Sequence, residues 1–227
     1  MKEQEDVASK WDLLNLWAKL NELGVNTDEL WRWIKDLVIK SIISVEHHMS
    51  VNYNRFQRNR GVCFEVYGFD VLIDKKLKPW LLEVNTLPSF SSSSPMDKQI
   101  KTQLMSDIFH LIGLSPYDKK KLEKEQETRQ WNRLLGLDKG SPNKRTSKNQ
   151  NLVIDENQNF REIVDKLSQD ELTMLVEYEE EMSRRNNFEL IFPRPNTVSN
   201  YEQYFSVKRQ NNLLLWKYVK SGKIKLL

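Results

Sequence analysis

The sequence predicts an α+β fold, in which an antiparallel β-hairpin belonging to a larger sheet is packed with helices and followed by a helical extension. Two observations lead to this prediction. Apolar residues recur every three to four positions over most of the chain, as they do in amphipathic helices. Between residues 62 and 85 the pattern becomes rich in β-branched and aromatic residues, which favour strands. The 227 residues are long enough for one large domain or two small ones.

Two helices are expected ahead of the strands. Residues 9–23 form an amphipathic helix, with Ser9 as its N-cap and Gly24 where a C-terminal glycine belongs. A longer helix starts at Thr27 and carries an extended apolar stripe. The polar run 52–61 then interrupts the helical spacing, so we expect a loop there.

The two strands are expected at residues 62–74 and 80–85, and the short polar segment between them predicts an antiparallel hairpin. If this hairpin turns at Lys76-Leu77, Asp70 lies opposite Glu83. The pairing of two carboxylates across neighbouring strands is the most informative feature of the sequence.

One face of the hairpin is therefore expected to carry a set of oxygen ligands. Strand alternation places Leu81, Glu83 and Asn85 on one face, with Asp70 opposite and Gly68 leaving space beside them. Charges in an otherwise apolar sheet need a partner, and a hard cation such as Mg²⁺ prefers such oxygen ligands. The alternative is a set of satisfied polar residues at strand ends, and the spacing alone leaves both interpretations open.

The remainder of the chain is predicted to be helical, apart from a serine- and proline-rich loop at 87–95 and a linker at 138–151. Gly113 ends the first of these helices. Ser168, followed three residues later by Glu171, has the capping-box pattern that begins another. The helices are expected at 96–112, 118–137, 157–186 and 200–220.

Charge is unevenly distributed along the chain, although the formal net charge is only +3. That near-balance argues against a nucleic-acid binder, and the single Cys excludes an intramolecular disulfide. No apolar run reaches the roughly eighteen residues of a membrane span. Residues 117–150 nevertheless hold 10 basic and 5 acidic side chains, whereas residues 151–188 hold 4 and 10. The basic block is either a surface for an acidic partner or a set of solvated helix faces.

Residues 10–115 resemble the C-terminal half of the ATP-grasp catalytic domain of tubulin tyrosine ligase-like proteins. The segments that carry the resemblance are Ser9-Lys10-Trp11, Ile34-Lys35-Asp36, Ser44-Val45-Glu46, Gly68-Phe69-Asp70 and Trp80-Leu81-Leu82-Glu83-Val84-Asn85. The resemblance implies that Asp70, Glu83 and Asn85 bind the Mg²⁺ ions of Mg-ATP. It also implies that Leu82 lines the nucleotide pocket.

Within that family, the segments Phe64–Asp70, Leu77–Trp80 and Glu177–Pro193 are most similar to the glutamylating branch. This resemblance implies ATP-dependent ligation of glutamate to Glu side chains of the acidic tubulin tails. It also gives the basic block a purpose, because a cationic segment after the catalytic domain engages the microtubule in such enzymes. The candidate residues here are Lys119, Lys120, Lys121, Lys124, Arg129 and Arg133.

These inferences divide the chain into a catalytic portion (residues 1–116), a basic helix and linker (117–150) and a helical extension (151–227). We expect a monomer in the cytoplasm on the microtubule cytoskeleton, with the cilium or basal body as a further setting. Because the part of the domain that clamps the phosphates is missing, we expect a fragment that is inactive alone. The alternatives are a non-catalytic microtubule-binding remnant and a glycyl or tyrosyl ligase of the same family.

Overall fold

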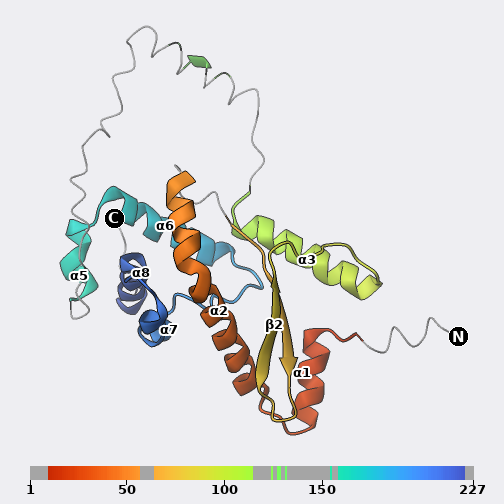
Figure 1. Cartoon of the computed structure of the whole chain (residues 1–227). Helices are drawn as coiled ribbons and strands as arrows, with labels where there is room; N and C mark the ends of the chain where they lie inside the picture. The colour runs from red at the N-terminus through yellow and green to blue at the C-terminus, as the bar shows by residue number, and fades with distance from the viewer. Residues whose placement is uncertain are drawn as a thin grey trace, which may run out of the picture. The chain divides into compact units, whose positions relative to one another are not determined.

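The computed structural model describes residues 10–56, 64–114 and 158–222, together with residues 124, 127, 128, 131 and 154. These residues combine helices with a two-stranded antiparallel sheet (Figure 1), and the α+β prediction is confirmed. They fall into two compact units, the first formed by residues 1–105 and 190–209 and the second by 106–189 and 210–227. Within the described residues, no helix combines the length and apolarity needed to cross a membrane.

Helix α1 (Leu13–Glu22) in the first unit begins later than predicted. Its N-cap is Asp12, whose carboxylate accepts a hydrogen bond from the backbone N–H of Asn15 at 2.7 Å. The predicted cap, Ser9, lies outside the described residues. The predicted end is confirmed, because Gly24 adopts the left-handed conformation with φ of +79°.

Helix α2 (Thr27–Phe56) begins where it was predicted, with the side chain of Asn26 accepting a hydrogen bond from the N–H of Glu29. It continues as far as Phe56, so the predicted loop at 52–61 is wrong for residues 52–56. No Gly or Pro occurs within α2. An established helix gains one hydrogen bond with each added residue, and polar composition alone does not end it.

The hairpin of the first unit consists of strands β1 (Gly68–Ile73) and β2 (Pro79–Asn85). Helix α2 packs against β2 and also against α1 (Figure 1). The indole rings of Trp17 and Trp31 meet edge to face at 5.9 Å between centroids, which fixes α1 on α2. Helix α2 therefore supports the hairpin, and α1 packs against α2.

Helix α3 (Pro95–Leu111) follows the hairpin, and its predicted end is confirmed by Gly113, which has φ of +69°. Ser94 acts as its N-cap, since its hydroxyl accepts a hydrogen bond from the N–H of Asp97 at 3.1 Å. The Asp97 carboxylate in turn accepts from both the N–H and the hydroxyl of Ser93. The serine run is thus an ordered loop, as predicted.

Residues 190–209, here called the return segment, bring the chain back to the first unit. The helix predicted at 200–220 is wrong in its middle, because Phe205 is extended, with φ of −79° and ψ of 133°. Phe205 packs against the cluster formed by Ile39 and Ile43 of α2, and this long-range contact overrides local helical spacing. The helical pieces on either side are α7 (Pro195–Tyr201), the 3₁₀ helix η2 (Glu202–Tyr204) and α8 (Gln210–Lys220).

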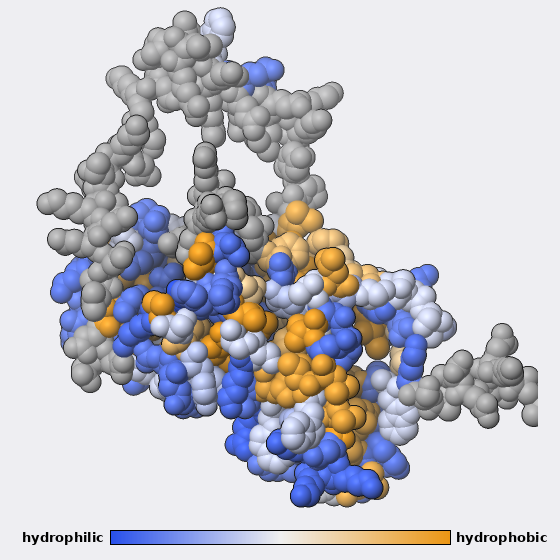
Figure 2. Space-filling view, in the orientation of Figure 1, coloured by the Kyte–Doolittle hydropathy of each residue, from blue (hydrophilic) through white to orange (hydrophobic). Residues whose placement is uncertain are grey.

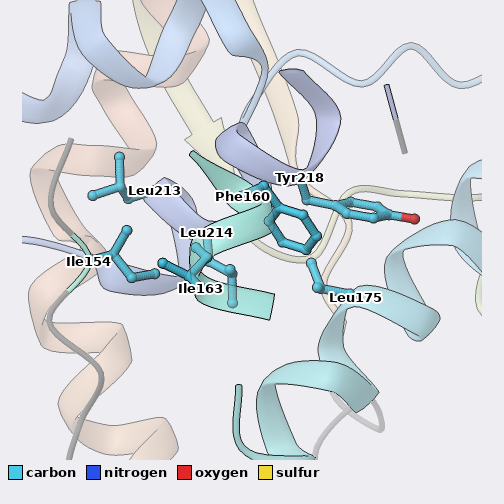
Figure 3. Packing of buried hydrophobic residues seen from close by; sticks show 7 residues of the cluster. All are labelled: Ile154, Phe160, Ile163, Leu175, Leu213, Leu214 and Tyr218. Carbon is cyan, nitrogen blue, oxygen red and sulfur yellow. The ribbon is translucent and has the colours of Figure 1, made fainter. Parts of the chain in front are cut away.

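The second unit has a hydrophobic core of its own (Figure 3). Leu175 and Leu214 are its most deeply buried side chains, each 0% exposed. The predicted capping box is confirmed, since the hydroxyl of Ser168 accepts from the N–H of Glu171 and the Glu171 carboxylate accepts from the N–H of Ser168. The elements that build this unit include α5 (Phe160–Ile163), the 3₁₀ helix η1 (Val164–Lys166), α6 (Gln169–Arg184) and α8.

Candidate metal and nucleotide site

The hairpin brings the three predicted metal ligands together. Asp70 pairs with Glu83 across the strands, as the turn position predicted, and Gly68 pairs with Asn85. The amide nitrogen of Asn85 donates to Glu83 Oε1 at 3.2 Å and to Asp70 Oδ2 at 3.5 Å. Both carboxylates are exposed and Asn85 is half-buried. The pair of charges is therefore hydrated and held close by one amide, rather than buried as the sequence argument assumed.

Space beside these ligands comes from Gly68. A Cβ atom placed on this residue would lie 3.3 Å from the Cβ of Pro88 and 3.6 Å from that of Asn85. The absence of a side chain therefore lets the loop that follows β2 approach the start of β1. This close approach keeps the Asn85 end of the hairpin compact.

A β-bulge interrupts the hairpin next to the carboxylates. The register shifts between Asp70 and Val71, so that Val71 pairs with Leu81 and Leu82 has no partner in β1. Bulges of this kind re-aim side chains, and they occur frequently beside active sites. The prediction that Leu81 shares a face with Glu83 is therefore wrong, because Leu81 pairs with the residue that alternates with Asp70.

The bulge also adds an aromatic residue to the carboxylate face. Trp80 pairs with Leu72, which lies two residues from Asp70 and so on the same face of β1. Trp80, Leu72 and the unpaired Leu82 are exposed, Leu82 to 64%. Figure 2 shows apolar side chains at the surface in the region of the hairpin. Strict strand alternation would place Trp80 on the opposite face, so its position beside the carboxylates could not be predicted from the sequence pattern.

The tip of the hairpin is fixed by Asp74. Its Oδ1 accepts hydrogen bonds from the backbone N–H groups of Lys76 at 2.8 Å and Lys78 at 3.0 Å. Its Oδ2 accepts from the indole N–H of Trp80 at 2.9 Å, and the ammonium of Lys78 lies 3.8 Å from the centroid of that ring. The Trp80 hydrogen bond, followed by that from Lys78, lowers the pKa of Asp74 below its ordinary value of 3.8.

A pH dependence of the hairpin follows from this lowered pKa. Because the folded state favours the ionised carboxylate, the stabilisation by Asp74 is complete above about pH 4 and is lost as the pH falls through the lowered pKa. Amide protection of the β1–β2 hydrogen bonds, measured by hydrogen exchange, should decrease over that range. Asp74→Asn should remove this part of the pH dependence and Glu65→Gln, outside the turn, should retain it. An identical pH profile in Asp74→Asn would contradict the assignment.

Most of the predicted tubulin-contacting residues fall outside the described part of the chain. They are Lys119, Lys120, Lys121, Arg129 and Arg133. Lys124 is described, and it is exposed and helical. Its carbonyl oxygen accepts a hydrogen bond from the hydroxyl of Thr128 at 2.7 Å, in the i to i+4 spacing of a helix. Its role in partner binding stays a prediction.

The donor set on the hairpin suits Mg²⁺ held together with a nucleotide. Within the described residues, no three His, Cys, Asp or Glu side chains gather into a closed metal cage. Mg²⁺ needs no such cage, because one or two carboxylates with substrate phosphates and water normally complete its shell. Asp70 and Glu83 would supply the carboxylates, and the oxygen of Asn85 would face them after a half-turn of its terminal amide torsion.

A pair of carboxylates that can share Mg²⁺ with substrate phosphates is the arrangement that nucleotide-dependent enzymes commonly use. Comparison with protein families matches residues 1–124 to the tubulin-tyrosine ligase family. The chain therefore belongs to this family, as its motifs predicted. The family implies the ATP-grasp fold.

Similar proteins match most of the chain. It is 34% identical over 230 residues to the tubulin monoglutamylase TTLL4 of Homo sapiens, covering 90% of this chain and 18% of that protein. It is 34% identical over 224 residues to the tubulin polyglutamylase ttll-4 of Caenorhabditis elegans, covering 95% and 36%. It is also 34% identical over 224 residues to the tubulin polyglutamylase TTLL5 of Mus musculus, covering 94% and 17%. The chain thus spans between 17% and 36% of the length of these relatives.

Proposed function

We propose that this chain acts in the ATP-dependent ligation of glutamate to Glu side chains of tubulin tails. The observation that carries the proposal is the convergence of Asp70, Glu83 and Asn85 on one face of the hairpin. Relatives named as tubulin glutamylases match 90% or more of the chain, which supports this substrate class. The corresponding setting is the microtubule cytoskeleton of the cytoplasm, including cilia or basal bodies.

The proposed reaction has two steps. The γ-phosphoryl group of ATP is transferred to an oxygen of the acceptor carboxylate, and ADP leaves. The amino group of glutamate then attacks the activated carbonyl carbon, and phosphate leaves as the amide forms. Bound Mg²⁺ neutralises the phosphate charge in such chemistry. Asp70, Glu83 and Asn85 would hold the metal, and Leu82 would contact the nucleotide beside them.

The proposal is tested by locating bound nucleotide on the 227-residue chain. Mn²⁺ replaces Mg²⁺ as a paramagnetic probe, and Mn²⁺–ATP is titrated while backbone amide signals are followed by NMR. We expect selective broadening of the amide signals of residues 70 and 82–85. Broadening that is absent from the hairpin, or equal for all amide signals, would refute the proposed site. Millimolar concentrations are needed, because we expect the isolated chain to bind ATP weakly.

A second role, microtubule binding, is favoured by the 10 basic side chains of residues 117–150. Charge reversal of Lys119, Lys120 and Lys121 to Glu should weaken co-sedimentation with microtubules by at least about fivefold at low salt, since each surface charge contributes up to about 1 kcal/mol. Added salt should reduce the difference. Reversal of Lys98, Arg161 and Lys166, three exposed cations outside this block, is the matched control. Unchanged co-sedimentation of the Lys119–Lys121 variant would refute the role of that cluster.

A further inference from the structure

One side of α2 is covered by the return segment. Ile39 and Ile43 of α2 are buried together with Tyr201, at 5%, 8% and 8% exposure respectively. The aromatic side chains of Phe192 and Phe205 pack against the same cluster, with 5.8 Å between their ring centroids. The return segment thus supplies apolar cover that α2 does not receive from its sequence neighbours.

Two polar contacts fasten the return segment at separate points along α2. The hydroxyl of Tyr201 donates to Asp36 Oδ1 at 2.8 Å, and Asp36 also accepts from the ammonium of Lys40 at 2.9 Å. Burial and the Asp36 hydrogen bond raise the pKa of Tyr201 to about 12, so that this hydroxyl stays a donor. Further toward the C-terminal end of α2, the guanidinium of Arg209 lies 2.7 Å from Glu46 Oε2, and both side chains are half-buried.

These contacts lie on one side of α2, and the hairpin is packed against the same helix. The side chains at positions 36, 39, 43 and 46 follow the spacing of three to four residues that keeps them on one helix face. Leu30 and Leu37 lie on the opposite side by the same geometry, and Leu30 is 1% exposed. Because α2 packs against β2, its position sets that of the strand that bears Glu83 and Asn85.

We propose that Tyr201 and Arg209 are positioning residues for the metal and nucleotide site. They contact Asp36 and Glu46 of α2 and lie outside the predicted ligand set. They act by fixing α2, which supports β2 and its two ligands. The return segment would then be part of the catalytic portion of the protein, although this segment lies beyond the basic block in the sequence. It rests on the proposed function because it takes the hairpin to be the metal and nucleotide site. The effect of the return segment on β2, in contrast, can be measured without nucleotide.

The test uses the whole 227-residue chain and two matched pairs of variants. Tyr201→Phe removes the hydroxyl that reaches Asp36, whereas Tyr204→Phe removes one from the exposed ring beside it. Arg209→Met removes the partner of Glu46 in α2. Lys208→Met removes the neighbouring cation, which lies 3.1 Å from Glu202 of the return segment. Hydrogen exchange of the β2 amides is measured first without nucleotide, and the affinity for Mn²⁺–ATP is measured second.

We expect Tyr201→Phe and Arg209→Met to lower protection of the β2 amides by about five- to tenfold, the factor that corresponds to one lost hydrogen bond. Mn²⁺–ATP affinity should fall by a similar factor, while Tyr204→Phe and Lys208→Met should change neither quantity. Exchanging the charges in the double variant Glu46→Arg, Arg209→Glu should restore both.

Unchanged β2 protection in Tyr201→Phe and Arg209→Met would overturn the proposal, and so would an equal loss in the two controls. If β2 protection falls while nucleotide affinity does not, the residues brace the hairpin without serving the site, and the proposal is equally overturned. Failure of the proposed function is recognised separately, because Mn²⁺–ATP would then bind no worse when Asp70 itself is replaced. These outcomes keep the two proposals distinguishable.

Discussion

Replacing Asp70 by Asn is expected to weaken binding of Mg²⁺–ATP by at least about tenfold, and Glu83→Gln should act similarly. Interactions with a charged partner contribute about 1.5–3 kcal/mol, and each 1.4 kcal/mol corresponds to a factor of ten. The amide keeps the shape of the carboxylate and still accepts the hydrogen bond from Asn85, so the hairpin should remain folded. Titration of nucleotide at saturating Mg²⁺, followed by NMR, measures the effect.

The matched control is Glu65→Gln, because it removes an exposed carboxylate from the segment just before β1 without touching the ligand set. Its affinity should equal that of the unaltered chain. Circular dichroism and hydrogen exchange establish that each variant is folded. An Asp70→Asn variant that binds Mg²⁺–ATP with unaltered affinity would exclude this carboxylate as a ligand, and it would remove the main support for the proposed function.

Leu214→Ala is expected to destabilise the second unit by about 2–5 kcal/mol, because truncation of a fully buried leucine loses transfer free energy and leaves a cavity. Leu214 is 0% exposed and lies in the core cluster that Figure 3 shows. Trp216 packs against that cluster, and because the chain has seven tryptophans, its resolved indole N–H signal in NMR spectra, rather than total fluorescence, reports on this unit during urea denaturation. The midpoint of that transition should shift to markedly lower urea concentration.

Val176→Ala provides the comparison for this core substitution. Val176 follows the buried Leu175 on α6 but is 47% exposed, so its truncation should cost less than about 0.5 kcal/mol. If the two variants shift the urea midpoint equally, the buried cluster does not determine the stability of the second unit.

The features of the fold that were predicted correctly are those with local causes. Gly24 and Gly113 end helices through a conformation that glycine adopts without strain, and the Ser168 capping box needs only four neighbouring residues. The pairing of Asp70 with Glu83 could also be predicted, because the length of a hairpin loop sets the register of the strands beside it. The juxtaposition of these two carboxylates therefore follows from the sequence.

The features that were missed depend on information that alternation and spacing do not contain. Trp80, Leu81 and Leu82 are three consecutive apolar residues, and no polar residue among them marks the one that bulges out. The break at Phe205 is set by contacts with Ile39 and Ile43, more than 160 positions away in the chain. Helical spacing continues through that point, so only the tertiary contact reveals the interruption.

The split of the first unit across the chain also has a consequence for synthesis on the ribosome. Asp36 and Tyr201 are 165 residues apart, and translation at roughly 5–20 residues per second separates their emergence by roughly 10–30 seconds. During that interval the Ile39 and Ile43 face of α2 has no cover from the return segment. A nascent chain therefore presents an apolar helix face to chaperones until its C-terminal part emerges, and a chain cut short before residue 190 presents it permanently.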